Sequence, residues 1–391
     1  MIMKCLEMIS HSRPRFHPSS RAIPALLLVG MLLFLLLAAE SAQGKEERGE
    51  HRLGNERVEA IADRIIKPAM NEKQLPSLVL GVVKNGQVVV NKGYGVRSFE
   101  SGRTPDENTV YYIGSLSKAI TAVGIMLLVE QGKVNLDTPA SNYLRGLPRI
   151  WQPITVAQFM AHQSGIPQLD KKLPTFRAML RSADATPLSF APETKQEYNN
   201  FNFAVAGKII EAVTGMNYLN YMRRAVFNPL GMNHTGLNIV SRDSAIGYRP
   251  SRFGPQPIQH RIAARYGIPS GHLQSTLSDL LKFYHAIQTG KLLKPATYEQ
   301  MVTRINPNLS GTPGWFEKKT GHDSIVSKNG ATQGSHSIMT FVSGKGDAVV
   351  MLWTSQKPKR NGLFKATNEL LREICGVGVH DQAEPTDDPQ D

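Results

Sequence analysis

A serine and a lysine three residues apart could together make a nucleophile. Ser115 is followed by Lys118 and then by the apolar run 119–129, which predicts a buried helix ending near Gly132. Residues three apart share a helix face, so the Lys118 amine would lie beside the Ser115 hydroxyl. A neutral amine can accept the hydroxyl proton, and burial favours the neutral form of lysine. Alone the pattern is weak, because a serine helix cap followed by an ordinary lysine has the same spacing.

A second candidate is the tyrosine of the triplet Tyr198-Asn199-Asn200, which precedes another apolar helical run. A tyrosine whose pKa falls below its ordinary value of about 10 can carry a proton to a leaving group. The Asn200 amide could bond to Lys118 or to a substrate amide. Taken alone, Tyr198 also fits a half-buried core residue, and Asn200 fits a turn before a helix.

A third candidate lies late in the chain, where Lys328-Asn329-Gly330-Ala331 precedes two strand-like runs. Lys328 could supply positive charge, and Gly330 would let a strand backbone approach a substrate closely. The same segment taken alone fits an exposed Asn-Gly turn. The three motifs are far apart in the sequence, so the fold must bring them together if they form one site.

The order and spacing of these motifs are similar to those of a known family. Serine β-lactamases and penicillin-binding proteins combine S-x-x-K with a middle hydroxyl or amide motif and a late K-T-G. The phrases AHQSGIP at 161–167 and PLGMNHT at 229–235 are also similar to the family's. From about Val58 to about Cys375, the chain resembles the class C β-lactamase-like serine hydrolases. That superfamily also includes D-alanyl-D-alanine carboxypeptidases, D-aminopeptidases and short-chain esterases.

The resemblance implies a role for each motif residue. Ser115 would be the nucleophile that forms an acyl-enzyme, and Tyr198 would pass a proton to the leaving group. Lys118 would accept the first proton or act electrostatically, and the sequence leaves open whether Lys118 or Tyr198 is the first base. The backbone N–H groups of Ser115 and Ala331 would form the oxyanion hole. The residues implied in substrate binding are Asn200, Lys328, Gly330 and Ala331. The resemblance implies neither a metal nor another cofactor.

The substrate is less well defined than the chemistry. The family often has Thr or Ser where Asn329 stands, and many esterase-like members have His where Lys328 stands. The segment 353–357 also lacks the asparagine that class C β-lactamases carry there. The predicted function is an exported serine hydrolase acting on an ester, an amide or a D-peptide. The alternatives are a true class C-type β-lactamase and a catalytically silent homologue that binds peptidoglycan or a partner, although the filled motif positions argue against silence.

Several histidines raise the question of a catalytic triad or a metal site, namely His162, His234, His272, His322 and His336. No H-E-x-x-H or G-x-S-x-G motif occurs, so the sequence supports neither a zinc protease nor an α/β-hydrolase. His162 and His234 lie in phrases that we interpret as structural. His336 follows Gly330 by six residues and could line the cleft.

The N-terminal region predicts export. Residues 1–24 are basic and residues 25–39 are apolar without a charge, which is typical of a signal peptide. Cleavage after Ser41 or Gly44 and retention as a membrane anchor both remain open, and either would leave the rest of the chain periplasmic or extracellular. The net charge is +13, and without the leader (+2) and the acidic tail (−5) residues 45–378 carry +16. This charge favours anionic surroundings such as cell-wall polymers, membrane faces or carboxylate substrates, whereas the absence of a nucleic-acid motif argues against nucleic acid.

The elements that would position the motifs form an α/β (α+β) pattern. Early and late strands are expected to make one antiparallel sheet flanked by helices, with a mainly helical insertion at about 133–265 carrying Tyr198. The β-lactamase/transpeptidase-like fold implies the same arrangement, with the site in the cleft between the two parts. The expected domain spans 55–378, after a leader at 1–44 and a linker at 45–54, and before a disordered tail at 379–391. The expected elements are a helix from Val58, strands 78–84 and 87–91 around an Asn85-Gly86 turn, helix 277–287, strands 337–342 and 348–353, and helix 363–375.

Overall fold

The computed structural model describes residues 54, 56–169, 173–239, 243–260, 265–356 and 363–378. The chain divides into two compact units, 1–57 and 58–391, and the second contains all three motifs. The predicted leader, the acidic tail and nearly all of the predicted linker lie outside the described residues. They therefore stay predictions, as do the domain boundaries.

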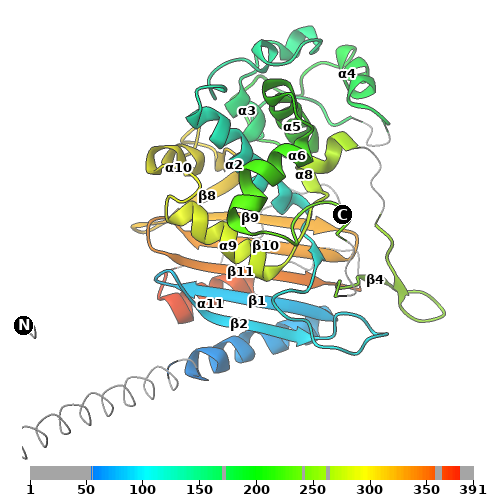
Figure 1. Ribbon diagram of the computed structural model, residues 1–391, viewed down its shortest axis with the longest axis vertical. Coiled ribbons are helices and arrows are strands. Elements are labelled where there is room, and N and C mark those ends of the chain that lie inside the picture. The colour runs from blue at the N-terminus through cyan, green and yellow to red at the C-terminus, as the bar shows by residue number, and fades with distance from the viewer. Residues whose placement is uncertain are drawn as a thin grey trace, which may run out of the picture. The chain divides into compact units, whose positions relative to one another are not determined.

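A seven-stranded antiparallel sheet forms the framework of the second unit, in the order β2-β1-β11-β10-β9-β8-β7 (Figure 1). The early strand β1 pairs with the late strand β11, which confirms that distant parts of the sequence share one sheet. Its strands are β1 (Ser77–Lys84), β2 (Gln87–Gly95), β7 (Gly311–Thr312), β8 (Trp315–Thr320), β9 (Asp323–Thr332), β10 (Ser335–Val342) and β11 (Asp347–Thr354).

The first hairpin forms where the sequence predicts it. Asn85 and Gly86 both have positive φ, 50° and 78°, which is the conformation of a two-residue turn that matches the twist of the flanking strands. The Asn85 N–H also donates to the Asp347 carboxylate at 2.8 Å, so the turn is fastened to the start of β11.

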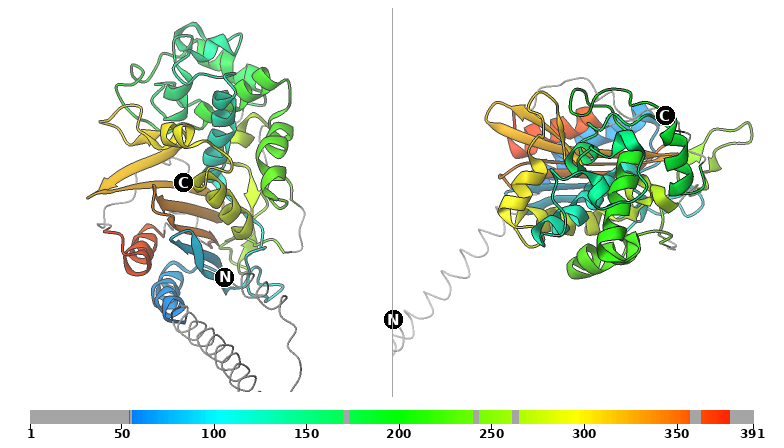
Figure 2. Two further views of the ribbon diagram at one scale, coloured as in Figure 1. Left: turned by 60° about the vertical axis from the view of Figure 1, so that its left-hand side comes forward. Right: turned by 90° about the horizontal axis from the view of Figure 1, so that it is seen from above.

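Two hydrophobic cores lie on opposite faces of the sheet (Figure 2). One face packs against the helix over 58–73 and against α11 (Phe364–Leu370) with its continuation to Cys375. The other face carries the remaining helices: α2 (Ser117–Glu130), α3 (Val156–Met160), α4 (Phe176–Asp184), α5 (Asn200–Thr214), α6 (Tyr218–Met222), α7 (Asn228–Leu230), α8 (Ile268–Gly271), α9 (Leu277–Gln288) and α10 (Pro295–Val302).

The expected helical insertion is mainly helical among its described residues, but it also contains a short hairpin that the sequence analysis missed. In this hairpin β4 (Tyr248–Arg249) pairs with β5 (Gln256–Pro257). Each strand has only two residues, and three prolines fall between 250 and 257, so no alternating apolar pattern marks them.

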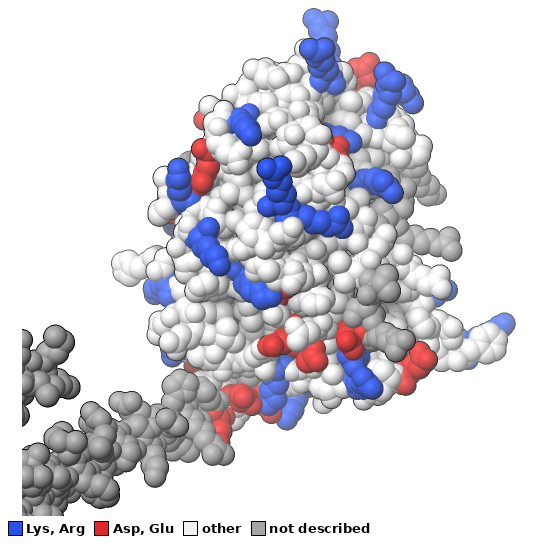
Figure 3. All heavy atoms as spheres, viewed as in Figure 1, with Lys and Arg blue, Asp and Glu red and all other residues white. Residues whose placement is uncertain are grey.

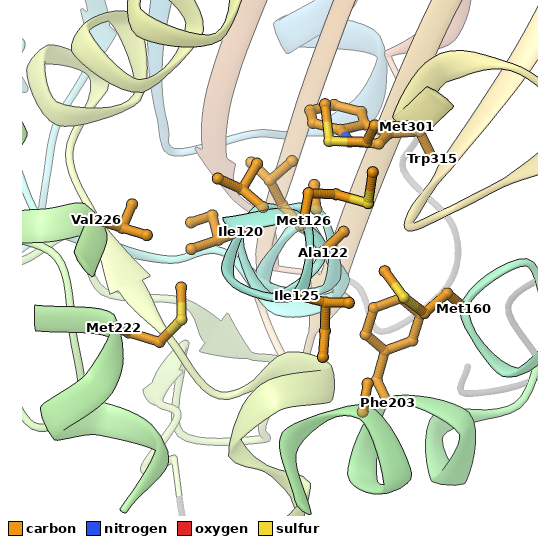
Figure 4. Packing of buried hydrophobic residues seen from close by; sticks show 14 of the residues in the cluster. Ile120, Ala122, Ile125, Met126, Met160, Phe203, Met222, Val226, Met301 and Trp315 are labelled. Atoms are coloured by element: carbon orange, nitrogen blue, oxygen red, sulfur yellow. The ribbon is translucent and has the colours of Figure 1, made fainter. Parts of the chain in front are cut away.

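Helix α2 is surrounded by apolar side chains (Figure 4). Ile120, Ile125 and Met126 are fully buried and point in different directions around the helix, toward side chains from α3, α5, α6 and α10. A helix that is apolar all round must be buried on every side, as the sequence predicted. Burying each such large side chain contributes about 1.5–3 kcal/mol to stability, so α2 is a firm support for the residues at its N-terminus.

Candidate active site

Ser115 lies in a tight turn immediately before α2. The helix was expected to begin near Ser115, but Gly114–Leu116 forms a 3-10 turn and α2 begins at Ser117. Gly114 has a φ of +48°, and a Cβ at this position would lie 2.6 Å from the Ala331 nitrogen. Only glycine allows this turn to approach β9 so closely. Ser115 itself is 7% exposed.

Lys118 is fully buried beside this serine. Its Nζ donates to Ser115 Oγ at 3.1 Å, to Asn200 Oδ1 at 2.7 Å and to the Ser270 carbonyl at 2.5 Å. These three acceptors match the three N–H donors of a protonated amine. The arrangement therefore satisfies Lys118 as an ammonium group held against the nucleophile.

Tyr198 contacts the same serine. Its hydroxyl lies 2.5 Å from Ser115 Oγ, and its side chain is 5% exposed. The Nζ atoms of Lys118 and Lys328 lie 4.6 and 4.8 Å from the centre of its ring. Two ammonium groups beside a phenol stabilise the negative charge that appears when the hydroxyl loses its proton. Tyr198 is thus well placed to exchange a proton with Ser115.

The third motif lies within β9 and not in an exposed turn. Lys328 is 2% exposed, and its Nζ also lies 4.5 Å from the centre of the Phe316 ring. A Cβ at Gly330 would lie 2.0 Å from the Ile113 carbonyl and 2.7 Å from Ser337 Oγ, so a side chain is excluded there. These contacts place the backbone of Gly330 and Ala331 against the turn that carries Ser115.

The seven residues predicted for the site therefore come together from three distant stretches. Lys118 and Tyr198 both contact Ser115 Oγ, Asn200 contacts Lys118, and Lys328 joins them through the Tyr198 ring. The N–H groups of Ser115 and Ala331 lie on adjacent backbone segments, as an oxyanion hole requires. Their catalytic roles stay predictions.

Three further residues belong to the surroundings of Tyr198, and the sequence analysis gave them no part in the site. The N–H of Asn199 and the amide of Asn202 donate to His162 Nδ1 at 3.2 and 3.0 Å. Asn199 also caps α5 and donates to the carbonyls of Ile166 and Pro167 at 3.0 and 3.1 Å. The signal for these contacts was the phrase at 161–167, which resembled the family's but was interpreted as structural.

Two residues near the third motif face away from it. The His336 ring stacks on Trp353 at 5.4 Å between centres, and its Nε2 lies 3.0 Å from Ser355 Oγ. Trp353 belongs to the core on the other face of the sheet, so the suggestion that His336 lines the cleft is wrong. Asn329 pairs with Ile338 of that same core, and strand alternation turns its side chain away from the face that carries Lys328.

No group of three or more His, Cys, Asp or Glu residues in the described ranges could hold a metal ion. The groups around the Ser115 hydroxyl are the Lys118 amine, the Tyr198 phenol, the Asn200 amide and the backbone of β9.

Within the same described ranges, none of the helices combines the length and the apolar character needed to cross a membrane.

Comparison with known proteins decides the family. The family model described as Beta-lactamase matches residues 62–373, which is most of the chain. The chain belongs to the Beta-lactamase family. Members of this family are generally serine hydrolases that work through an acyl-enzyme. The matched range contains all three motifs of this Beta-lactamase family protein.

Individual relatives agree with this assignment. Protein flp of Staphylococcus aureus (strain N315) is 28% identical over 299 residues, which cover 69% of this chain and 58% of flp. The match therefore spans less than two thirds of that relative's length. A structure titled as a class C beta-lactamase has a TM-score of 0.73 at 20% identity, covering 82% of this chain and 97% of that one.

A second solved structure has the same fold. It is titled as the octameric penicillin-binding protein homologue from Pyrococcus abyssi, with a TM-score of 0.68 at 24% identity and coverage of 80% of this chain and 76% of that one. At these identities the two structures establish the fold of this Beta-lactamase family protein and leave its substrate to be inferred from the site.

Proposed function

We propose that the chain is an exported serine hydrolase in which Ser115 forms an acyl-enzyme with an ester, an amide or a D-peptide. One observation carries the proposal: Ser115 Oγ lies within hydrogen-bond distance of both Lys118 Nζ, at 3.1 Å, and the Tyr198 hydroxyl, at 2.5 Å. A serine becomes a good nucleophile when a neighbouring group takes its proton, and here two groups that can handle protons meet at its oxygen.

Acylation would begin when Ser115 Oγ attacks the substrate carbonyl carbon and its proton passes to Tyr198. The three acceptors around Lys118 favour the charged amine, so we assign the role of base to the phenolate of Tyr198 and an electrostatic role to Lys118. The carbonyl oxygen becomes an oxyanion, and the N–H groups of Ser115 and Ala331 would stabilise it.

Collapse of this intermediate breaks the bond between the carbonyl carbon and the leaving group. Tyr198 returns its proton to the departing oxygen or nitrogen, which leaves an ester between the acyl group and Ser115 Oγ. A water molecule then attacks the carbonyl carbon of that ester, with Tyr198 again accepting a proton. The bond between this carbon and Ser115 Oγ breaks, Tyr198 returns the proton to Oγ, and the acid product leaves the regenerated serine.

Among substrates, we favour a short-chain ester over a cephalosporin. A β-lactamase must hold the substrate carboxylate and deacylate rapidly. Lys328 has the positive charge that a carboxylate would need, but its Nζ lies close to the rings of Tyr198 and Phe316. The Asn329 side chain points away from the face that carries Lys328, so it presents no hydrogen-bonding group there. The test is kcat/KM on a short-chain p-nitrophenyl ester and on a chromogenic cephalosporin. A cephalosporin value near 10⁶ M⁻¹s⁻¹, on the order of an efficient enzyme, with little esterase activity would reverse this ranking.

Export and an anionic environment are part of the same proposal. The leader pattern at 1–39 supports export, and the surface of the domain supports anionic surroundings. On the face shown in Figure 3, lysine and arginine side chains predominate over the helical part. The exposed residues of the helical part include Arg177, Arg181, Arg223 and Arg224. A basic surface would favour work close to anionic cell-wall polymers, so a peptide or ester derived from the cell wall is a suitable substrate for this protein.

Labelling with a fluorophosphonate tests the proposal against the silent-homologue alternative. The wild-type protein should gain one phosphonyl group, and Ser115→Ala should gain none while keeping its fold by circular dichroism. A wild-type protein that stays unlabelled would favour the alternative of a catalytically silent homologue. A labelled alanine variant would place the nucleophile elsewhere.

A further inference from the structure

We propose that His162 is a positioning residue for the reaction, which clamps the peptide groups on both sides of Tyr198 and so holds the phenol at Ser115. The inference rests on the proposed function, because it assigns Tyr198 a part in proton transfer. The hydrogen bonds and the closest ring contact of His162 lead to Tyr198 and its chain neighbours, so it would act through Tyr198.

Two hydrogen bonds from the chain on either side of Tyr198 form this clamp. The backbone carbonyl of His162 accepts a hydrogen bond from the Glu197 N–H at 2.9 Å, and its ring Nδ1 accepts one from the Asn199 N–H at 3.2 Å. Glu197 and Asn199 are the two neighbours of Tyr198 in the chain. The His162 and Tyr198 rings also pack together, with their centres 4.5 Å apart. One residue therefore fixes the backbone before Tyr198, the backbone after it and the ring itself.

The backbone of His162 is adapted to this task. Its φ is +60°, in the left-handed region where most residues with a Cβ are strained but His is found more often than others. The side chain is only 3% exposed. A strained conformation at a buried position persists when the surrounding contacts require it, and here those contacts lead to Tyr198.

The hydrogen bonds also define the protonation state of the ring. A backbone N–H can only donate, so Nδ1 must carry a lone pair and the ring proton of the neutral form must be on Nε2. The Asn202 amide is a second donor to the same nitrogen, at 3.0 Å. In a doubly protonated ring, the Nδ1–H of His162 would face the Asn199 N–H, and the hydrogen bond between these two residues would be lost.

Burial and nearby positive charge keep the ring neutral. Burial, together with the charges of Lys328 on β9 and Lys118 on α2, holds the pKa of His162 well below its ordinary value. Among the described residues, the rings packed against it are those of Tyr198, which can titrate, and of Phe203 and Phe316, which carry no charge. His162 can therefore serve as a hydrogen-bond acceptor over the whole neutral pH range, but it is a poor acid or base there.

Two substitutions separate positioning from simple packing. His162→Phe keeps a ring but removes the Nδ1 acceptor, whereas His162→Asn offers an amide oxygen and tolerates the left-handed backbone. The matched control is His336→Asn, which alters another buried neutral histidine on the opposite face of the sheet. All proteins are compared by kcat and KM for a p-nitrophenyl ester, per active site titrated with a fluorophosphonate.

We expect His162→Phe to lower kcat per titrated site by ~10- to 100-fold with little change in KM, because a displacement of about 1 Å can have an effect of this size. His162→Asn should recover most of that loss, and His336→Asn should keep the wild-type kcat per titrated site even if it is less stable. A normal kcat for titrated His162→Phe, or an equal loss in both His162 variants, would overturn the inference. If the wild-type protein itself neither titrates nor turns over the ester, the proposed function fails instead.

A measurement on the wild-type protein covers the case in which His162→Phe does not fold. In ¹⁵N-histidine NMR spectra at neutral pH, the His162 ring should show an unprotonated Nδ1 and a protonated Nε2. A cationic ring, or the opposite tautomer, would overturn the inference without any substitution.

Discussion

Replacing Gly330 with alanine should separate β9 from the nucleophile turn and suppress turnover. A Cβ at this position would lie 2.0 Å from the Ile113 carbonyl, 2.7 Å from the Leu116 nitrogen and 2.7 Å from Ser337 Oγ. Real Cβ atoms essentially never lie under 3.0 Å from such an atom, and ordinary contacts lie at 3.4–4 Å, so the strand or the turn must move by about 1 Å or more against backbone atoms that cannot rotate away. Ser337 Oγ also donates to the Ile113 carbonyl at 2.7 Å, so the methyl group would disturb that bond as well.

The displacement would remove Ala331 from the oxyanion hole. Losing one oxyanion donor typically lowers kcat by about 10²–10³-fold, and overpacking a core lowers stability by roughly 1–3 kcal/mol. The assay is kcat per titrated site together with a urea unfolding curve. Gly81→Ala on β1 is the control, because its added methyl group meets only the flexible ends of Leu277 and Leu281 and should leave kcat per site unchanged. A near-normal kcat for Gly330→Ala would show that the close approach of β9 has no part in catalysis.

Two further predictions concern proton transfer and stability. Tyr198→Phe and Lys118→Ala should each slow turnover by at least ~10²-fold, a typical scale for a lost acid–base group at Tyr198 and for lost electrostatic stabilisation at Lys118, and a near-normal kcat would remove that residue from the mechanism. Burial lowers the pKa of His336 to about 4, so unfolded protein takes up a proton below pH ~6.5 that the folded protein refuses. The contribution of neutral His336 to the free energy of unfolding should therefore be fully present above pH ~6.5. This contribution, roughly 3 kcal/mol, should be lost as the pH falls from ~6.5 to about 4. His336→Asn should flatten part of the decline in urea unfolding between about pH 7 and pH 5, and an unchanged slope would contradict the assignment.

Local features of the fold could be predicted because neighbouring residues determine them. The Asn85-Gly86 turn needs only its own backbone preference, and it has the expected positive φ values. The contact between Ser115 and Lys118 likewise follows from helical spacing, even though Ser115 lies in a 3-10 turn before the helix. The meeting of Tyr198 with these residues was implied only by the family resemblance, since no local rule connects them.

Features that depend on strand register could not be predicted in the same way. The turn after β9 pairs His336 with Ala331, and a shift of one residue would have turned the His336 ring to the opposite face of the sheet. Asn329-Gly330 has the composition of a turn, yet it continues β9 because its backbone packs against the Ser115 turn. The role of His162 depends on a backbone carbonyl and a ring nitrogen that contact a segment 35 or more residues away. The phrase at 161–167 is similar to the family's, but no local rule connects it with Tyr198.

The central claim is that Ser115 carries the acyl group during turnover. Rapid acid quenching of the protein during hydrolysis of a p-nitrophenyl ester, followed by intact-mass and peptide mass spectrometry, tests it directly. We expect a transient adduct of one acyl group located on Ser115, which Ser115→Ala does not form and which Tyr198→Phe forms more slowly. Steady hydrolysis with no adduct, or an adduct on another residue, would show that Ser115 does not carry the acyl group.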